Sequence, residues 1–153
     1  ELAELDPDNA STYQENYDAL AAQIEDLEAS AESVKETAGG KDAAITEPVP
    51  LYLLDAVGLT NVTPEEFSEA VEEGADVPAR VLAETLDLFS AGDVAVLAYN
   101  SQTEDATTEQ VREAAEAADV QVVDFTETLP EGMGYVEWMQ SNLDALADSV
   151  GGQ

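Results

Sequence analysis

The 153-residue sequence contains no cysteine and no histidine. The absence of cysteine excludes disulfide bonds and thiolate chemistry. The absence of histidine removes imidazole as a catalytic base and as a metal ligand within the chain. A serine or cysteine nucleophile activated by histidine is therefore excluded as well.

Positive charge is almost as scarce, because 35 aspartate and glutamate residues stand against 4 lysine and arginine residues, for a net charge of -31. Nucleic acid and anionic membrane surfaces are excluded as partners, since both are bound through clusters of cations. A calcium-loaded acidic protein would carry D-x-D-x-D-G loops or acidic repeats, and the sequence has neither. The carboxylates are spread along the chain, which predicts a solvated acidic surface and a stability that rises with added salt.

Long apolar runs are also missing from the sequence. No stretch of about 18 apolar residues is present, so no membrane span is predicted, and no signal-peptide pattern opens the chain. The sequence starts at Glu1 in the middle of a pattern of residues, and we therefore interpret the chain as a piece of a longer functional unit. The hydrophobic fraction of 44% and the length of the chain favour one domain with a sizeable core.

Hydrophobic periodicity predicts a long N-terminal helix. Apolar residues recur at steps of three and four from Tyr13 to Val34, and Gly39-Gly40 ends the pattern. We expect this amphipathic helix to pack along a domain. A coiled-coil seam is the alternative, but small residues and tyrosines in the stripe fit it less well. The predicted organisation is a linking helix over residues 1–38 and an α/β lobe over residues 39–153, forming a single domain overall.

Strands and helices alternate after this first helix. The sequence predicts strands at residues 44–46, 94–99 and 120–123, and a short fourth strand near residues 61–62. Residues 94–99 are a continuous apolar run, which is typical of a parallel strand buried on both faces. The alternation indicates right-handed βαβ units and a three-layer α/β fold, with a mostly parallel sheet of three to four strands flanked by helices.

Polar side chains stand where three of these strands end. Glu47 follows the first strand, and Pro48 prevents further ladder pairing because it has no N–H group. Asn100, Gln102 and Glu127 follow the other two strands. Parallel strands all end at one edge of a sheet, where ligands bind in open α/β folds. Carboxylate and amide oxygens together suit a hard cation such as Mn²⁺, Mg²⁺ or Ca²⁺, and solvated strand ends are the alternative in so acidic a chain.

Three segments of the chain resemble a known family. They are LDPDNASTYQENYDAL (residues 5–20), ITEPVPLYLLDAVGL (residues 45–59) and VVDFTETLPEGMGYVEWMQSNLDAL (residues 122–146). Residues 5–20 are similar to the start of a helix that links two lobes. Residues 45–59 are similar to a strand–ligand–helix segment, and residues 122–146 to the closing segment of that family. The closing segment ends in a Y-x-x-x-M-x-x-N-L pattern, which Tyr135, Met139, Asn142 and Leu143 match. With these segments, the chain resembles the C-terminal lobe of the zinc/manganese solute-binding proteins of bacterial ABC importers, a family of metal-binding lipoproteins and adhesins.

The resemblance implies roles for two residues. Glu47 takes the position of a glutamate or histidine metal ligand, and Glu127 that of a carboxylate ligand, usually aspartate. Glutamate at the first position is typical of manganese-binding members, whereas zinc-specific members tend to have histidine there. The family's two other ligands are histidines of an N-terminal lobe, which this chain does not contain. The family's usual Tyr-Phe pair is Tyr52-Leu53 here.

The resemblance further implies capture of Mn or Zn by an extracytoplasmic protein, at the cell surface or in the periplasm, whose parent form is lipid-anchored. Its partners would be the metal ion, the N-terminal lobe of the same parent protein and an ABC permease. The isolated lobe is expected to bind metal weakly or not at all, because first-row metals favour nitrogen-containing sites.

An interaction module and an enzyme are the alternatives to this interpretation. The alternative function is an acidic α/β interaction module that uses the long helix as a docking face. An enzyme is not expected, because neither a G-x-x-x-x-G-K loop nor a G-x-G-x-x-G turn is present. Paired carboxylates, as in glycoside hydrolysis, are the remaining enzymatic possibility.

Overall fold

Four short segments form one open, fully parallel sheet in the computed structural model, which describes residues 1–151. The order across the sheet is β2-β1-β3-β4. The strands are β1 (Asp42–Ile45), β2 (Thr60–Asn61), β3 (Val94–Asn100) and β4 (Gln121–Phe125). All seven residues of β3 are buried, because helices cover both faces of the sheet at its centre. The three-layer α/β fold predicted from the sequence is confirmed.

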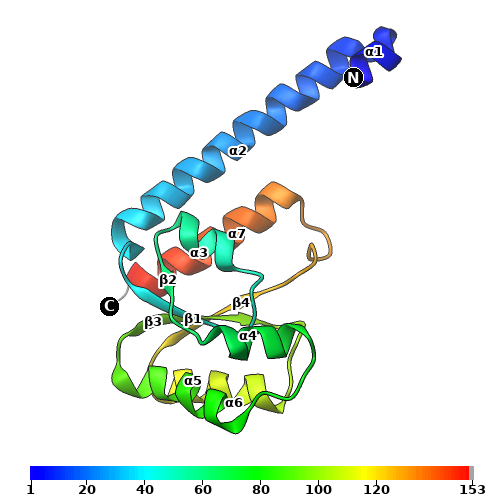
Figure 1. Ribbon diagram of the computed structural model, residues 1–153. Coiled ribbons are helices and arrows are strands. Elements are labelled where there is room, and N and C mark those ends of the chain that lie inside the picture. Colours follow the sequence, from blue (N-terminus) through cyan, green and yellow to red (C-terminus); the bar gives the residue numbers. More distant parts are fainter. Residues whose placement is uncertain (152–153) are drawn as a thin grey trace.

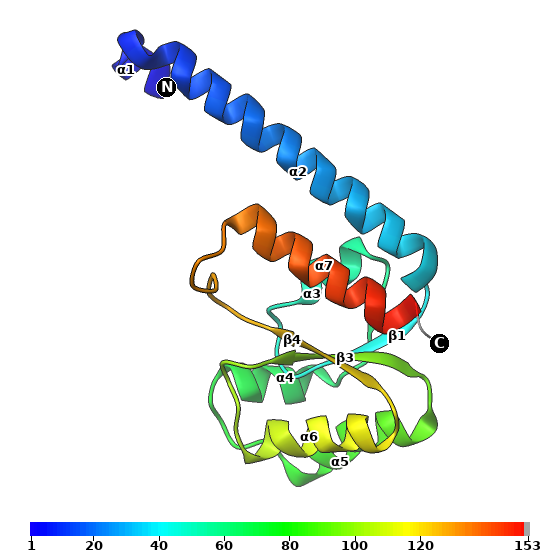
Figure 2. The same cartoon turned by 180° about the vertical axis from the view of Figure 1, so that it is seen from behind.

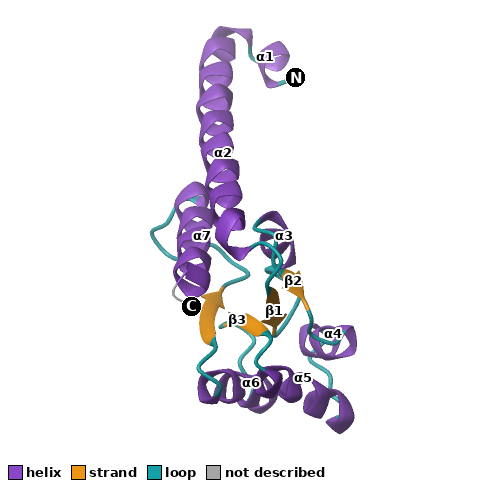
Figure 3. Cartoon of the chain, turned by 90° about the vertical axis from the view of Figure 1, so that its left-hand side faces the viewer, coloured by secondary structure: helices purple, strands orange, loops and turns teal. Residues whose placement is uncertain are grey.

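Helices fill the connections and cover both faces of the sheet (Figure 1). They are α1 (Leu2–Leu5), the 3₁₀-helix η1 (Pro7–Asn9), α2 (Ala10–Ala38), α3 (Leu51–Ala56), α4 (Glu65–Glu72), α5 (Ala79–Ala91), α6 (Ala106–Ala117) and α7 (Tyr135–Gly151). The end of α2, with α3 and α7, lies over one face, and α4, α5 and α6 lie over the other (Figure 3). Within the described residues, every helix is too short or too polar to cross a lipid bilayer.

Prolines mark the starts of three helices. Pro50, Pro64 and Pro78 stand immediately before α3, α4 and α5. A proline is tolerated at this place because the first N–H groups of a helix have no partner within it. The α3 helix consequently begins soon after β1 ends, and the residues between them are confined to a short, proline-rich turn.

Alternation along the central strand divides the core into two layers. Val96 and Ala98 belong to the cluster under α7 and the end of α2, whereas Leu97 and Tyr99 belong to the cluster under α5 and α6. Successive side chains of a strand point to opposite faces, so this one buried strand supplies both layers. The sheet is thereby fixed between its helices, and the ends of its strands form a rigid edge.

Only the second half of α2 packs on the lobe. Its buried residues are Leu27, Ala31, Val34 and Ala38, and this part lies beside α7 (Figure 2). The first half projects away from the lobe, and the same apolar stripe continues there in exposed form. The division into residues 1–38 and residues 39–153 stays a prediction, although α2 ends at the expected residue.

Candidate metal centre

Three strands end side by side at the carboxyl edge of the sheet. Ile45 of β1 is in register with Ala98 of β3, and Asn100 of β3 with Phe125 of β4. The residues that follow β1 and β4 therefore flank the end of β3. This edge holds Glu47, Asn100, Gln102 and Glu127, the four residues singled out from the sequence.

Glu47 is a buried carboxylate with an unsatisfied oxygen. Its exposed fraction is 3%, and its Oε1 has no hydrogen-bond partner among the residues that the structure describes. The pKa of Glu47 is raised to about 7, chiefly by burial and next by the negative charge of Glu127. A hydrogen bond to Glu127 favours the protonated form of Glu47, and the charge of Glu72 adds a smaller effect. The two predicted ligands thus face each other at this edge of the sheet.

Glu127 is held by hydrogen bonds from the end of β3. The side-chain amide of Asn100 donates to Glu127 Oε1 over 2.9 Å. The Gln102 side-chain oxygen accepts the backbone N–H of Glu127 at 2.7 Å and that of Thr128 at 3.1 Å. These contacts fix both the backbone and the carboxylate of Glu127, although the glutamate lies on a loop.

Two threonines that sequence reasoning missed hold the end of β1. The Thr63 hydroxyl accepts the backbone N–H of Ile45 at 2.8 Å and so continues the sheet beyond the short strand β2. The Thr46 hydroxyl accepts the backbone N–H of Asn100 at 2.9 Å. Thr46 stands directly before Glu47 in the sequence, and a polar residue at the end of an apolar strand is the signal that could have identified it.

No arginine neutralises the glutamate pair. Within residues 1–151, Arg80 pairs with Glu66 and Glu84, while Arg112 pairs with Asp124 and lies 4.0 Å from Glu104. Both clusters lie away from the pair. A buried carboxylate that lacks a cationic partner is energetically costly, in agreement with the raised pKa of Glu47.

The edge supplies an incomplete coordination shell. In the described part of the chain, no group of three or more histidine, cysteine, aspartate or glutamate side chains lies close enough to hold a metal ion. Two carboxylates can bind one side of a divalent cation, whose other positions must be filled by water or by ligands from elsewhere.

An apolar hollow of about 300 Å³ adjoins Glu127. Tyr135, Met139 and Asn142 line it from one face of α7, which explains the spacing of the sequence pattern in which they occur. Tyr135 and Trp138 pack edge to face, with ring centroids 6.5 Å apart. Aromatic side chains therefore border Glu127 on this side.

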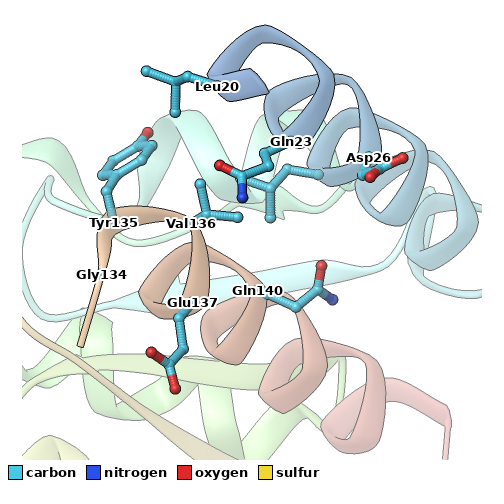
Figure 4. Close-up of a pocket in the computed structure, with 9 residues that line it drawn as sticks. Leu20, Gln23, Asp26, Gly134, Tyr135, Val136, Glu137 and Gln140 are labelled. Carbon is cyan, nitrogen blue, oxygen red and sulfur yellow. The ribbon is translucent and has the colours of Figure 1, made fainter. Parts of the chain in front are cut away.

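A second hollow, of about 630 Å³, lies between α2 and the start of α7. Figure 4 shows Leu20 of α2 and Tyr135 and Val136 of α7 on its walls. Tyr135 lines both hollows. The exposed stripe of α2 is thus continuous with the surface beside the glutamate pair.

The α/β fold places the carboxylate pair at the carboxyl edge of a parallel sheet, where ligands bind in open α/β proteins. Residues 1–149 match the family profile described as zinc-uptake complex component A, periplasmic, and the chain belongs to this family. The resemblance noted from the sequence is thereby confirmed. A search among curated protein sequences gave no match.

Several solved structures share this fold. The laminin-binding protein Lmb of Streptococcus agalactiae, titled a bifunctional protein with adhesin and metal transporting activity, matches with a TM-score of 0.75 and 20% identity over 97% of this chain and 56% of that chain. FpvC of Pseudomonas aeruginosa, solved with Mn²⁺, matches with a TM-score of 0.69 and 24% identity over 98% and 55%. The periplasmic zinc-binding protein TroA of Treponema pallidum matches with a TM-score of 0.74 and 17% identity over 97% and 56%. The chain therefore spans about half the length of these structures.

Proposed function

We propose that the chain forms one lobe of an extracytoplasmic solute-binding protein that captures Mn²⁺ or Zn²⁺ for ABC-type import. The observation that carries the proposal is the buried Oε1 of Glu47, which has no hydrogen-bond partner in the described structure while Glu127 faces the same carboxyl group. A divalent cation would replace the repulsion between the two carboxylates by attraction to both.

Glu47 and Glu127 are the ligands in this proposal. The oxygens of the Asn100 and Gln102 side chains already accept backbone N–H groups, so neither is needed in the coordination shell. The metal is the cargo of the protein. It must leave again, and a shell shared between two separable parts binds and releases more readily than a closed one.

Several observations support a second lobe above the glutamate pair. The chain covers only 55% of FpvC and 56% of TroA. Tyr17 and Leu20 on the projecting half of α2 are 68% and 47% exposed, which leaves an apolar stripe for that lobe to cover. We propose that this lobe supplies the remaining ligands, histidines among them, and that an ABC permease receives the ion. The parent protein would be lipid-anchored at the cell surface or in the periplasm.

The family and the names of similar proteins favour transport over catalysis. The family is described as an uptake component, FpvC was solved with Mn²⁺, and TroA is a zinc-binding protein. An acidic interaction module that docks through α2 remains the second candidate, because the exposed stripe of α2 is the feature on which such a module would rely.

Metal titration of the chain tests the proposal. In about 1 M KCl the Debye length is about 3 Å, so diffuse attraction to the net charge of -31 is suppressed. We expect weak, saturable Mn²⁺ binding that broadens NMR signals around Glu47 and Glu127, and Zn²⁺ shifts at the same positions. Glu47→Gln and Glu127→Gln should each weaken this response strongly, leaving only the residual affinity of the other carboxylate. Glu116→Gln, which removes an exposed carboxylate of α6, should leave it intact, and an equal loss in all three variants would contradict the proposal.

A further inference from the structure

We propose that Asn100 is a positioning residue of the metal site, which orients the Glu127 carboxylate and leaves one of its oxygens to the cation. This inference rests on the proposed function, since it assigns a role toward the same ion. Asn100 is the last residue of β3, and its exposed fraction is only 1%. A buried asparagine must satisfy both ends of its amide, and each end is used at this site.

Asn100, Gln102 and Glu127 form a closed ring of hydrogen bonds. The Asn100 side-chain NH₂ donates to Glu127 Oε1 at 2.9 Å, the Glu127 backbone N–H donates to Gln102 Oε1 at 2.7 Å, and the Gln102 backbone N–H donates to Asn100 Oδ1 at 2.9 Å. Each member both donates to and accepts from the ring. The ring joins the end of β3 to the loop after β4.

The ring determines which way the Asn100 amide points. Its oxygen must face the Gln102 N–H, because a backbone N–H can only donate. Its NH₂ group must therefore face Glu127, and an NH₂ group does not coordinate a metal ion. Asn100 thus acts on the cation through Glu127, in contrast to the direct ligand role considered from the sequence.

The same residue also contacts the other side of the site. The Asn100 backbone N–H donates to the Thr46 hydroxyl at 2.9 Å, and Thr46 is bonded to Glu47 in the chain. Asn100 consequently sets the spacing between the segments that carry Glu47 and Glu127. Asn100 engages Oε1 of Glu127, so the cation is bound through Oε2. The carboxylate is already ordered and does not have to be ordered when the ion arrives.

A double-mutant cycle tests this role on the whole chain, with Mn²⁺ as the probe and paramagnetic broadening of amide signals as the readout. Asn100→Ala should weaken Mn²⁺ binding about tenfold, as is usual for residues that orient a metal ligand. In the Glu127→Ala background, Asn100→Ala should cause no further loss, because Asn100 then has no carboxylate to orient. Asn61→Ala is the matched control: it removes an asparagine at the end of β2 whose side chain accepts the Thr63 N–H, and it should leave the affinity unchanged.

Three results would overturn the inference. They are an unchanged affinity in folded Asn100→Ala, a tenfold loss that persists in the Glu127→Ala background, and an equal loss in Asn61→Ala. If Asn100→Ala does not fold, the near-isosteric Asn100→Leu provides the same measurement. Failure of the proposed function gives a different pattern, since Glu47→Gln and Glu127→Gln would then bind Mn²⁺ as the unaltered chain does.

Discussion

Two acids near the end of β4 have opposite electrostatic environments. Asp124 pairs with Arg112, and the Arg112 guanidinium lies 3.9 Å from the centre of the Tyr99 ring and 4.0 Å from Glu104. Glu127 follows closely in the chain, yet it faces Glu47 and no arginine. The charge of Asp124 is balanced by an arginine of the same chain. Among the described residues, the charge at Glu47 and Glu127 has no such partner.

The difference is informative because cations are so rare in this chain. There are 4 lysine and arginine side chains, and each is engaged away from the glutamate pair. Lys35 pairs with Glu32, Lys41 donates to the Val150 carbonyl, Arg80 pairs with Glu84, and Arg112 pairs with Asp124. In the Asp124 region, Arg112 is a structural counter-ion supplied by the chain itself. Among residues 1–151 the Glu47 region has no such counter-ion, which is what the proposed site for an exchangeable cation requires.

Replacing Glu47 by glutamine is expected to give the largest change. The pKa of Glu47 is about 7 in the folded chain, against an ordinary value of 4.5. Between these two values the unfolded chain binds fewer protons than the folded chain, so this group lowers stability as the pH rises from 4.5 to about 7. Glu47→Gln removes the penalty and should stabilise the chain by about 3 kcal/mol above pH 7, with no gain below pH 4.5.

Urea unfolding of Glu47→Gln across this pH range checks the prediction. The exposed variant Glu116→Gln measures the general benefit of removing one negative charge, and the comparison between the two isolates the local effect. A Glu47→Gln variant that is destabilised, or stabilised equally at every pH, would show that Glu47 carries no penalty of its own.

Replacing Arg112 by glutamine should act in the opposite direction. The variant loses the cation–π contact with Tyr99 and the ion pair with Asp124. The Arg112 side chain is 27% exposed, so screening by water is only partial. We expect a loss of about 1–2 kcal/mol in urea unfolding at pH 7. An unchanged midpoint would mean that the Asp124 region is no better compensated than the Glu47 region.

Much of the fold follows from local patterns. The apolar run at residues 94–99 can only be satisfied between two helical layers, and it became the buried strand β3. The prolines before α3, α4 and α5 predict where helices begin. The projecting half of α2 was not predicted, because the apolar stripe continues unbroken from Tyr13 while the packed part begins at Leu27.

The sequence predicts where the candidate site lies in the fold, but not its detailed geometry. Parallel strands necessarily end at one edge, so Glu47 and Glu127 were expected there. Which strands are neighbours depends on tertiary packing, and the central position of β3 between β1 and β4 places Asn100 between the glutamates. The hydrogen-bond ring depends on the orientation of the Asn100 amide at the end of β3 and on the conformation of the loops that carry Gln102 and Glu127, and no spacing in the sequence specifies these.

Replacing Glu127 by glutamine separates the two main causes of the raised pKa of Glu47. Burial is the largest cause of the raised pKa of Glu47, and the charge of Glu127 is the next. In Glu127→Gln the pKa of Glu47 should fall and still stay above 4.5, because burial remains. Carbon-13 NMR titration of the Glu47 carboxyl group measures it directly. Asp124→Asn is the control and should leave this pKa unchanged, since Arg112 already balances Asp124. A full return to the ordinary value would make charge, and not burial, the dominant cause.

Replacing Arg80 by glutamine should have the smallest effect, although its ion pairs look at least as good as those of Arg112. Arg80 lies 2.7 Å from Glu84 and 3.2 Å from Glu66, but its side chain is 68% exposed. Water and salt screen such pairs, and ordering the long side chains offsets the remaining attraction. Arg80→Gln should leave the thermal midpoint within error in the same buffer in which Arg112→Gln lowers it. If both variants lose the same stability, then the scarcity of cations, and not the burial of one of them, governs this chain. Every arginine would in that case act as a counter-ion to the acidic surface as a whole, and the lack of a cation beside Glu47 and Glu127 would no longer set that site apart.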